Sequence, residues 1–346
     1  MNSDNQDLSR IKIFLGFIVF VIMILILKEL RTIFIPLCMA LLLYFLFNGV
    51  VKRLTYLKIP KFLIMSFLLL FIFIVFYFSG VLIFGGVSSF VQKFPAYSTK
   101  ITAMASALWE QIKIPLGDVN QYIDRFDWGQ PISALTTLLS RTFGSFAVFF
   151  GNLVLVIIFL MFMLAGRTAL MLRVKRAFEE PQADRLIYII NSIENHVQHY
   201  LLIKIFVSLL TAVISGMIIF AGGIDFVVFS AILIFVLNFI PNVGSIIATV
   251  FPVLIGLINY GLSLRVLLVG VGLVLTQMII GNVVEPKITG KNLNLSPIVI
   301  LISLILWGWL WGITGMILAV PLTSAMKIIF EHIEVLKPLA SLISAE

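Results

Sequence analysis

The sequence predicts an all-α polytopic membrane protein. Of its 346 residues, 61% are hydrophobic and 12% are charged, whereas soluble domains carry about 25% charged residues. Six apolar runs are long enough to cross a bilayer as a helix, which takes about 20 residues. Two further apolar stretches in the last third are broken by polar residues, proline and glycine. We therefore expect about six full transmembrane helices and two broken or re-entrant helical hairpins, with an external amphipathic helical segment.

Six apolar runs predict the full spans, and they are Ile11 to Leu27, Ile33 to Val51, Phe62 to Phe84, Phe146 to Ala165, Leu201 to Ala221 and Leu264 to Ile280. Short cytoplasmic loops of membrane proteins are rich in Lys and Arg, and this bias sets the orientation of the chain. Basic clusters follow the second and fourth runs, at Lys52, Arg53, Lys58 and Lys61 and at Arg167, Arg173, Lys175 and Arg176. Both termini are then expected in the cytoplasm, with the protein in a bacterial inner membrane.

This pattern divides the chain into six expected parts. They are N-terminal transmembrane helices (1–84), an external amphipathic segment (85–145), the fourth transmembrane helix (146–165), a cytoplasmic amphipathic linker (166–200), a transport region (201–331) with hairpins at 226–257 and 297–329, and a cytoplasmic tail (332–346). Pro95, Pro115 and Pro131 are expected to interrupt the external segment, because proline breaks helices.

Several function classes do not fit the composition. The net charge of +8 comes from basic residues in short loops, so the sequence predicts no nucleic-acid partner. The single cysteine, Cys38, excludes a disulfide framework, and His196 and His199 have no third ligand at metal-binding spacing. Nucleotide-binding and metalloprotease signatures are absent from the sequence. We expect neither an enzyme nor a bound cofactor or metal.

The break in the first hairpin is the leading candidate for a substrate site. Inside a bilayer every backbone polar group needs a partner, so irregular backbone persists only beside protein or a water-filled cavity. The break offers amides and a hydroxyl next to residues that stop a helix, and we assign the substrate-binding role to Asn238, Pro241, Asn242, Gly244 and Ser245. The alternative is that these polar groups simply hold helices together. Asp225, at the start of this hairpin, is expected to cap its first helix.

The sixth span carries further polar residues. Gln277, Gly281 and Glu285 are four residues apart, which places them on one face of a regular helix. We add Gln277 to the substrate-binding set, and we assign Asn282, Glu285 and Lys287 to the path or to coupling, because intramembrane acids are usually functional. The alternative for Glu285 is an ion pair with Lys287 or Lys291 among the headgroups.

The second hairpin is broken by interleaved glycines and tryptophans, and its expected tip comprises Trp307, Gly308, Gly312 and Gly315. Gly308 and Gly312 have the GxxxG spacing that lets helices approach closely. The tryptophans are either anchors at the membrane interface or donors facing a polar cavity.

Four motifs occur together in the last third: Pro241-Asn-Val-Gly-Ser245, Val284-Glu-Pro-Lys-Ile-Thr-Gly-Lys291, Leu295-Ser-Pro297 and Trp311-Gly-Ile-Thr-Gly-Met-Ile-Leu-Ala-Val-Pro321. Their order and spacing resemble the autoinducer-2 exporter family of bacterial transporters. The resemblance implies transport by alternating access without ATP. It also implies a homo-oligomer, for which a pentamer is one expected assembly. It carries the family's motif positions, but not individual roles, to Pro241, Asn242, Gly244, Glu285, Pro286, Lys287, Gly290 and Lys291.

Three functions follow as hypotheses. The first is export of a small polar organic solute, such as the autoinducer-2 signal, bound between the hairpin tips. The second is sodium or lithium/proton antiport, which some relatives resemble and which needs an ionisable carboxylate deep in the membrane; the carboxylates that qualify are Glu285 and Asp225. The third is a membrane scaffold for envelope proteins, and the polar break from Asn238 to Ser245 argues against it. The expected partners are membrane lipids, a small-molecule substrate and further copies of the chain.

Overall fold

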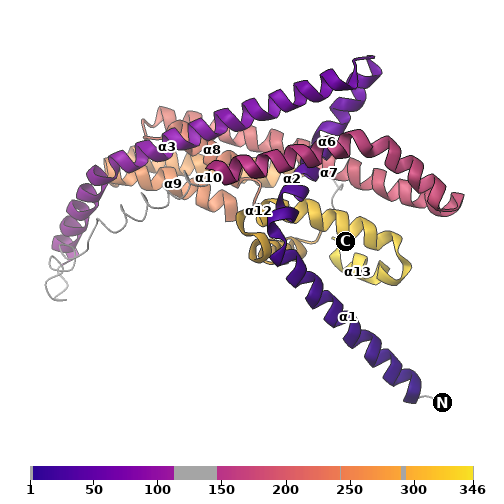
Figure 1. The fold of residues 1–346 in the computed structure, drawn as a ribbon. Helices are drawn as coiled ribbons and strands as arrows, with labels where there is room; N and C mark the ends of the chain where they lie inside the picture. The colour runs from indigo at the N-terminus through magenta and orange to yellow at the C-terminus, as the bar shows by residue number, and fades with distance from the viewer. Residues whose placement is uncertain (1–2, 113–145, 242, 290–293, 346) are drawn as a thin grey trace. The chain divides into compact units, whose positions relative to one another are not determined.

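The structure is a computed structural model that describes residues 3–112, 146–241, 243–289 and 294–345. Every regular element in these ranges is a helix (Figure 1). Seven of the described helical segments are long and apolar enough to cross a membrane. The expectation of an all-α multi-pass membrane protein is confirmed.

The chain forms two compact units, and each is assembled from distant segments. Unit 1 comprises Met1–Val50, Asn152–Gln198 and Leu293–Glu346, and unit 2 comprises Val51–Gly151 and His199–Asn292. Unit 1 contains α1 (Ser3–Glu29), most of α2 (Arg31–Tyr56) and α6 (Phe146–Ala177), α12 (Pro297–His332) and α13 (Lys337–Ile343). Unit 2 contains α3 (Lys61–Ile112), α8 (Val227–Leu237), α9 (Val243–Tyr260), α10 (Leu264–Ile279), η1 (Ile280–Val284) and α11 (Glu285–Thr289). The 42-residue helix α7 (Glu180–Ala221) contributes its first half to unit 1 and its second half to unit 2.

The predicted spans all lie within helices, but two boundaries differ from the expected ones. Helix α3 continues from the third span to Ile112, and Pro95 lies inside it, so the expectation that Pro95 interrupts the helix is wrong. Pro115 and Pro131 lie outside the described residues. The expected linker 166–200 consists of the end of α6, a short turn and the start of α7, which continues without a break into the fifth span.

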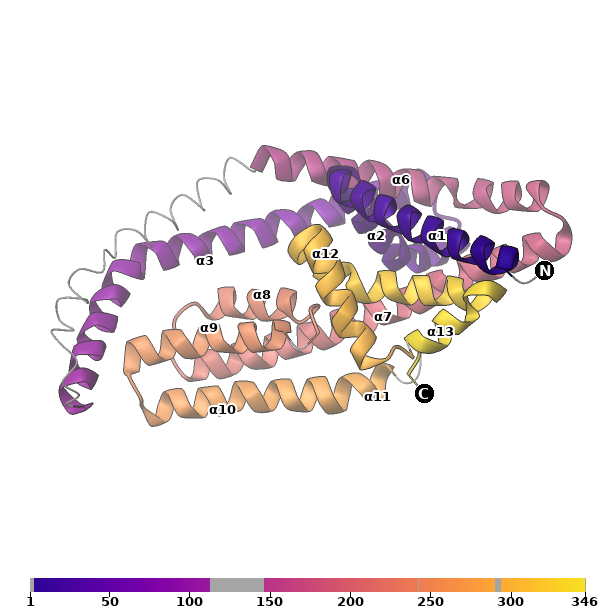
Figure 2. The same cartoon turned by 90° about the horizontal axis from the view of Figure 1, so that it is seen from below.

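The first hairpin consists of α8 and α9, which fold back on each other, while α10 runs beside α9 (Figure 2). Backbone hydrogen bonds close its tip, from the N–H of Ile240 to the carbonyl of Leu237 at 2.8 Å and from the N–H of Gly244 to the carbonyl of Ile240 at 3.1 Å. Gly244 is buried, and a Cβ atom at this position would overlap the carbonyl oxygen of Leu237. The tip therefore needs glycine for close approach of the two arms.

The second hairpin is formed by α12, which breaks at a single residue. Gly312 adopts φ 64° and ψ −144°, outside the helical region, and glycine tolerates this positive φ because it has no side chain. A Cβ atom at Gly315 would overlap the carbonyl oxygen of Trp307, which repeats the close approach in the first hairpin. The indole Nε1 of Trp311 donates to the carbonyl of Leu27 at 3.0 Å, so this tryptophan joins the tip to α1 and does not face a polar cavity.

The core of unit 2 lies where α3, α7, α8, α9 and α10 meet. Its buried apolar side chains are Tyr97, Ala212, Ile219, Ile224, Ile234, Ala248, Ile255, Val269 and Leu273. Other apolar side chains of these helices are exposed, as expected for helices that face lipid. This core holds the first hairpin against the second half of α7.

We predict that Gly244→Ala destabilises the hairpin tip. The added methyl group must push α8 and α9 apart at the carbonyl of Leu237, and overpacking of this kind costs about 1–3 kcal/mol. The measurement is the thermal midpoint of the purified protein in detergent. Gly80→Ala in α3 is the matched control, because a Cβ atom there has open space. Equal midpoints for the two variants would contradict the close approach.

Candidate functional site

A polar face runs along the second half of α7. Lys204, Ser208, Thr211 and Ser215 are spaced by four, three and four residues, so they share one side of the helix. All four are buried, in a segment that is otherwise apolar. Polar side chains inside membrane spans are costly and mark functional sites. We call these four residues the polar stripe of α7.

One end of the stripe is an ion pair. The Nζ atom of Lys204 lies 2.6 Å from Oε1 of Glu285, and the side chains are 6% and 24% exposed. Pairing is required here because an isolated ammonium group in a low-dielectric interior loses its hydration without compensation. The expected partners of Glu285 were different: Lys287 is exposed, and Lys291 lies outside the described residues. Glu285 instead faces inward, toward α7.

A π-helical turn precedes Glu285. Element η1 separates α10 from α11 and contains Gly281 and Asn282. Such turns are rare and frequently occur at functional sites. The expected common face of Gln277, Gly281 and Glu285 requires a regular α-helix, and the π-helical turn between them interrupts it. A Cβ atom at Gly281 would have no neighbour within 4 Å among the described residues. Ile280 and Val284 pack against Ile203 and Val207 of α7.

The hairpin tip reaches the stripe through one amide. The Nδ2 atom of Asn238 donates to Oγ of Ser208 at 3.0 Å. Pro241 and Gly244 shape the tip, and the carbonyl of Ser245 accepts a hydrogen bond from Thr249 at 2.8 Å. Asn242 lies outside the described residues. Asn238 is thus the predicted tip residue that the structure joins to α7.

Four buried polar atoms of unit 2 have no hydrogen-bond partner among the described residues. They are Nε2 of Gln277 and the Oγ atoms of Ser215, Ser230 and Ser263. A buried donor without a partner costs about 1–3 kcal/mol, so groups of this kind favour a polar ligand or water beside them. The sequence predicted Gln277 as a binding residue but missed the three serines.

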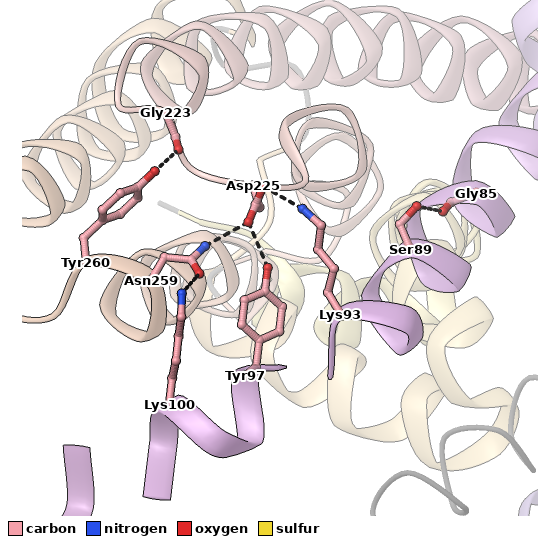
Figure 3. Close-up of polar contacts among 9 residues, drawn as sticks. All are labelled: Gly85, Ser89, Lys93, Tyr97, Lys100, Gly223, Asp225, Asn259 and Tyr260. Carbon is pink, nitrogen blue, oxygen red and sulfur yellow. Dashed lines mark hydrogen bonds and ion pairs between the residues drawn. The ribbon is translucent and has the colours of Figure 1, made fainter. Parts of the chain in front are cut away.

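Asp225 ties the base of the first hairpin to α3 (Figure 3). Its carboxylate accepts hydrogen bonds from Lys93 Nζ at 2.9 Å, from Tyr97 OH at 3.0 Å and from Asn259 Nδ2 at 2.9 Å. Asn259 in turn accepts from Lys100 Nζ at 3.1 Å. We call this group the Asp225 clamp. The expectation that Asp225 caps α8 is wrong, because the N-cap position is Phe226, without a side-chain cap.

The clamp sets the protonation of Asp225. Partial burial raises the pKa of the carboxyl group, but the hydrogen bonds from Lys93, Tyr97 and Asn259 outweigh it, so the pKa of Asp225 lies below its ordinary value. The carboxylate therefore stays charged at neutral pH and holds α3, the loop before α8 and the end of α9 together.

The remaining predicted residues fall into two groups. Asn282 and Lys287 are exposed, and the second tip, with Trp307, Gly308, Gly312 and Gly315, belongs to unit 1. Among the described residues, no group of three or more His, Cys, Asp or Glu side chains could hold a metal ion. The structure thus brings together Asn238 and Glu285 with Ser208 and Lys204. Sequence periodicity could have found the last two, since they recur at helical spacing.

Long apolar helices that enclose paired charges and a buried polar stripe are typical of a multi-pass membrane transporter. Residues 15–334 match the model of the AI-2E family transporters, and the chain belongs to this family. It is 33% identical over 327 residues to a candidate transport protein of Borreliella burgdorferi, covering 90% of this chain and 84% of that protein. It is 29% identical over 303 residues to the AI-2 transport protein TqsA of Escherichia coli K12, covering 87% and 86% of the two chains. The resemblance given by the motifs is confirmed.

We predict energetic coupling between Lys204 and Glu285. Lys204→Met and Glu285→Gln should each reduce the free energy of unfolding by somewhat less than the ~3–5 kcal/mol typical of fully buried pairs. A lower thermal midpoint of the purified protein reports this loss. The double variant should lose less than the sum, because it leaves no unpaired charge. Lys287→Met, at an exposed site, is the control. Strictly additive losses would show that the pair does not interact.

We predict that the Asp225 clamp weakens in acid. Because the pKa in the folded state is depressed, the stabilisation is fully present above the unfolded value of about 3.9 and is lost as the pH falls through the folded value. Amide hydrogen exchange over residues 222–226 should be slower in the parent than in Asp225→Asn at pH 7, and the difference should shrink as the pH falls below about 3.9. Asp184→Asn, at an exposed site, is the control. A difference that stays unchanged down to the lowest pH at which the protein remains folded would rule out the carboxylate as its source.

Proposed function

We propose that this transporter exports a small, polar, largely uncharged organic solute, with the autoinducer-2 signal as the leading candidate. The observation that carries the proposal is the hydrogen bond between Asn238 at the hairpin tip and Ser208 on the buried stripe. A relative with 29% identity over most of both chains is named an AI-2 transport protein. That name and the chemistry of the site support the same class of ligand.

The chemistry of the site favours a neutral ligand. Lys204 and Glu285 compensate each other, so the stripe presents hydroxyl and amide groups without net charge. Hydroxyl groups of a solute both donate and accept, which suits Asn238, Ser208 and the unpartnered donor of Gln277. In this proposal Asn242 and Ser245 complete the tip, while Asn282 and Lys287 lie along the path or take part in coupling.

Alternating access would act through the hairpin tip. When a solute hydroxyl replaces Ser208 as the partner of Asn238, the bond that holds the tip to α7 is lost, and the tip becomes free to move relative to the stripe. We propose a re-entrant hairpin, an orientation with both termini in the cytoplasm of a bacterial inner membrane, and a homo-oligomeric assembly. We propose that transport uses no ATP, in keeping with the absence of a nucleotide-binding signature from the sequence.

We predict that Asn238→Ala and Ser208→Ala weaken transport while leaving membrane insertion intact. A hydrogen bond lost inside a dry site costs roughly 1–3 kcal/mol, or about 5- to 150-fold in affinity. The measurement is flux of the labelled furanosyl signal in proteoliposomes. Ser89→Ala is the control, because the hydroxyl of Ser89 is exposed and bonds only locally to Gly85. If the double variant transports at the parent rate and affinity, the site lies elsewhere.

A further inference from the structure

Unit 1 contains a buried charge cluster that the proposed transport site does not use. Glu194 of α7 is 3% exposed and accepts hydrogen bonds from Tyr44 OH at 2.6 Å and from Asn48 Nδ2 at 2.9 Å. Arg167 of α6 donates to it through Nε at 3.1 Å and Nη2 at 2.8 Å. Four donor atoms thus compensate the carboxylate, and we call this group the Glu194 cluster.

A cavity of about 610 Å³ opens beside this cluster. One side is formed by Phe159, Met163, Gly166 and Leu170 of α6, which share a helix face by their spacing of four, three and four residues. Residues of α2, α7 and α12 complete an apolar wall, while Tyr44, Arg167 and Glu194 supply polar atoms. Apolar walls with a few convergent polar groups are the usual form of a ligand site.

Arg167 provides the cationic end of this cavity. Its bonds to Glu194 and Asn191 use Nε and Nη2, and the side chain remains 25% exposed where it lines the cavity. A guanidinium group has five donors, so Nη1 is suited to a phosphate oxygen. Three further cations, Arg173, Lys175 and Arg176, follow near the end of α6 and are exposed.

The depth of the cavity matches a lipid. The apolar run 146–165 ends two residues before Arg167, which places this side chain at headgroup level. Phe159 lies eight residues earlier, or about 12 Å along the helix axis. An acyl chain occupies half of a hydrocarbon core that is about 30 Å thick, or roughly 15 Å. The apolar wall therefore has about the length of one leaflet's acyl chain.

We propose that this cavity binds one anionic phospholipid, with its phosphate on Arg167 and an acyl chain along Phe159, Met163 and Gly166. The Glu194 cluster holds the guanidinium group of Arg167 at the mouth of the cavity. The donors from Tyr44, Asn48 and Arg167 compensate the carboxylate of Glu194, which would otherwise repel phosphate. The site is independent of the solute site, because it uses no residue of the polar stripe.

The test fills the cavity without touching the cluster. A Cβ atom at Gly166 meets open space, and so does one at Gly151 on the same helix, but Gly166 alone of the two lines the cavity. The full-length protein is purified in mild detergent, and native mass spectrometry measures binding of phosphatidylglycerol and of phosphatidylethanolamine. Gly166→Leu should weaken phosphatidylglycerol binding at least fivefold, Gly166→Ala should weaken it less, and Gly151→Leu should bind as the parent does.

Three results would overturn the proposal. The first is that Gly166→Leu binds phosphatidylglycerol with the affinity of the parent. If the leucine variant does not fold, the same result for Gly166→Ala counts instead. The second is equal binding of the two lipids by the parent, which would remove the role of charge. The third is a change of oligomeric state in Gly166→Leu with unchanged lipid binding, which would make this surface a contact between copies of the chain.

Discussion

A low-dielectric interior cannot hydrate a charged side chain, and the fold of this chain depends on how it pairs the charges that it buries. Glu194 and Lys204 lie on the same helix, α7, at 3% and 5% exposure. Arg167, Tyr44 and Asn48 compensate the first in unit 1, and Glu285 compensates the second in unit 2. Arg167 comes from the preceding helix α6, whereas Tyr44, Asn48 and Glu285 come from segments 150, 146 and 81 residues away. Each pair therefore fixes where its segment packs against α7, since a misplaced segment would leave a buried charge without compensation.

Glycine solves a second problem, which is how to turn a helix sharply without losing backbone hydrogen bonds. In each hairpin a glycine at the start of the returning arm sits against a carbonyl group at the end of the first arm, Gly244 against Leu237 and Gly315 against Trp307. In the first tip, backbone N–H groups donate hydrogen bonds to nearby carbonyl groups in tight turns. Consequently the tip presents the side chain of Asn238 to the polar stripe, and its irregular backbone needs no separate cavity.

Patterns that repeat along the chain made much of the fold predictable. The apolar runs gave the spans, and the breaks at Pro241 and Gly312 gave both hairpins, because these features depend on neighbouring residues only. Pro95 misled because a long helix can continue through one proline when the neighbouring turns keep their hydrogen bonds.

Contacts between distant segments set the candidate site, and they left little trace in the local pattern. Glu285 was singled out as an intramembrane acid, but its partner Lys204 lies 81 residues away, and neighbouring lysines looked like equally good partners. The same holds for Asp225, whose donor Lys93 is 132 residues away. Lys204 also lies inside the apolar run Leu201 to Ala221, whose pattern predicts only a membrane span. A search of each span for polar residues at helical spacing would have found the stripe, though not what faces it.

The geometry of the ion pair bears on the choice between organic solute and cation. A carboxylate that carries a proton and a metal cation in turn must be open to both, with room for several oxygen ligands around the cation. Glu285 instead lies 2.6 Å from an ammonium group that is itself buried. A sodium or lithium ion would have to displace Lys204 and leave it unpaired in a dry interior, at a cost of several kcal/mol. A neutral solute avoids this cost, because it exchanges hydrogen bonds with Asn238 and Ser208 and leaves the ion pair in place. The same pair that stabilises unit 2 therefore disfavours cation exchange at this carboxylate and favours a solute recognised by hydroxyl and amide groups.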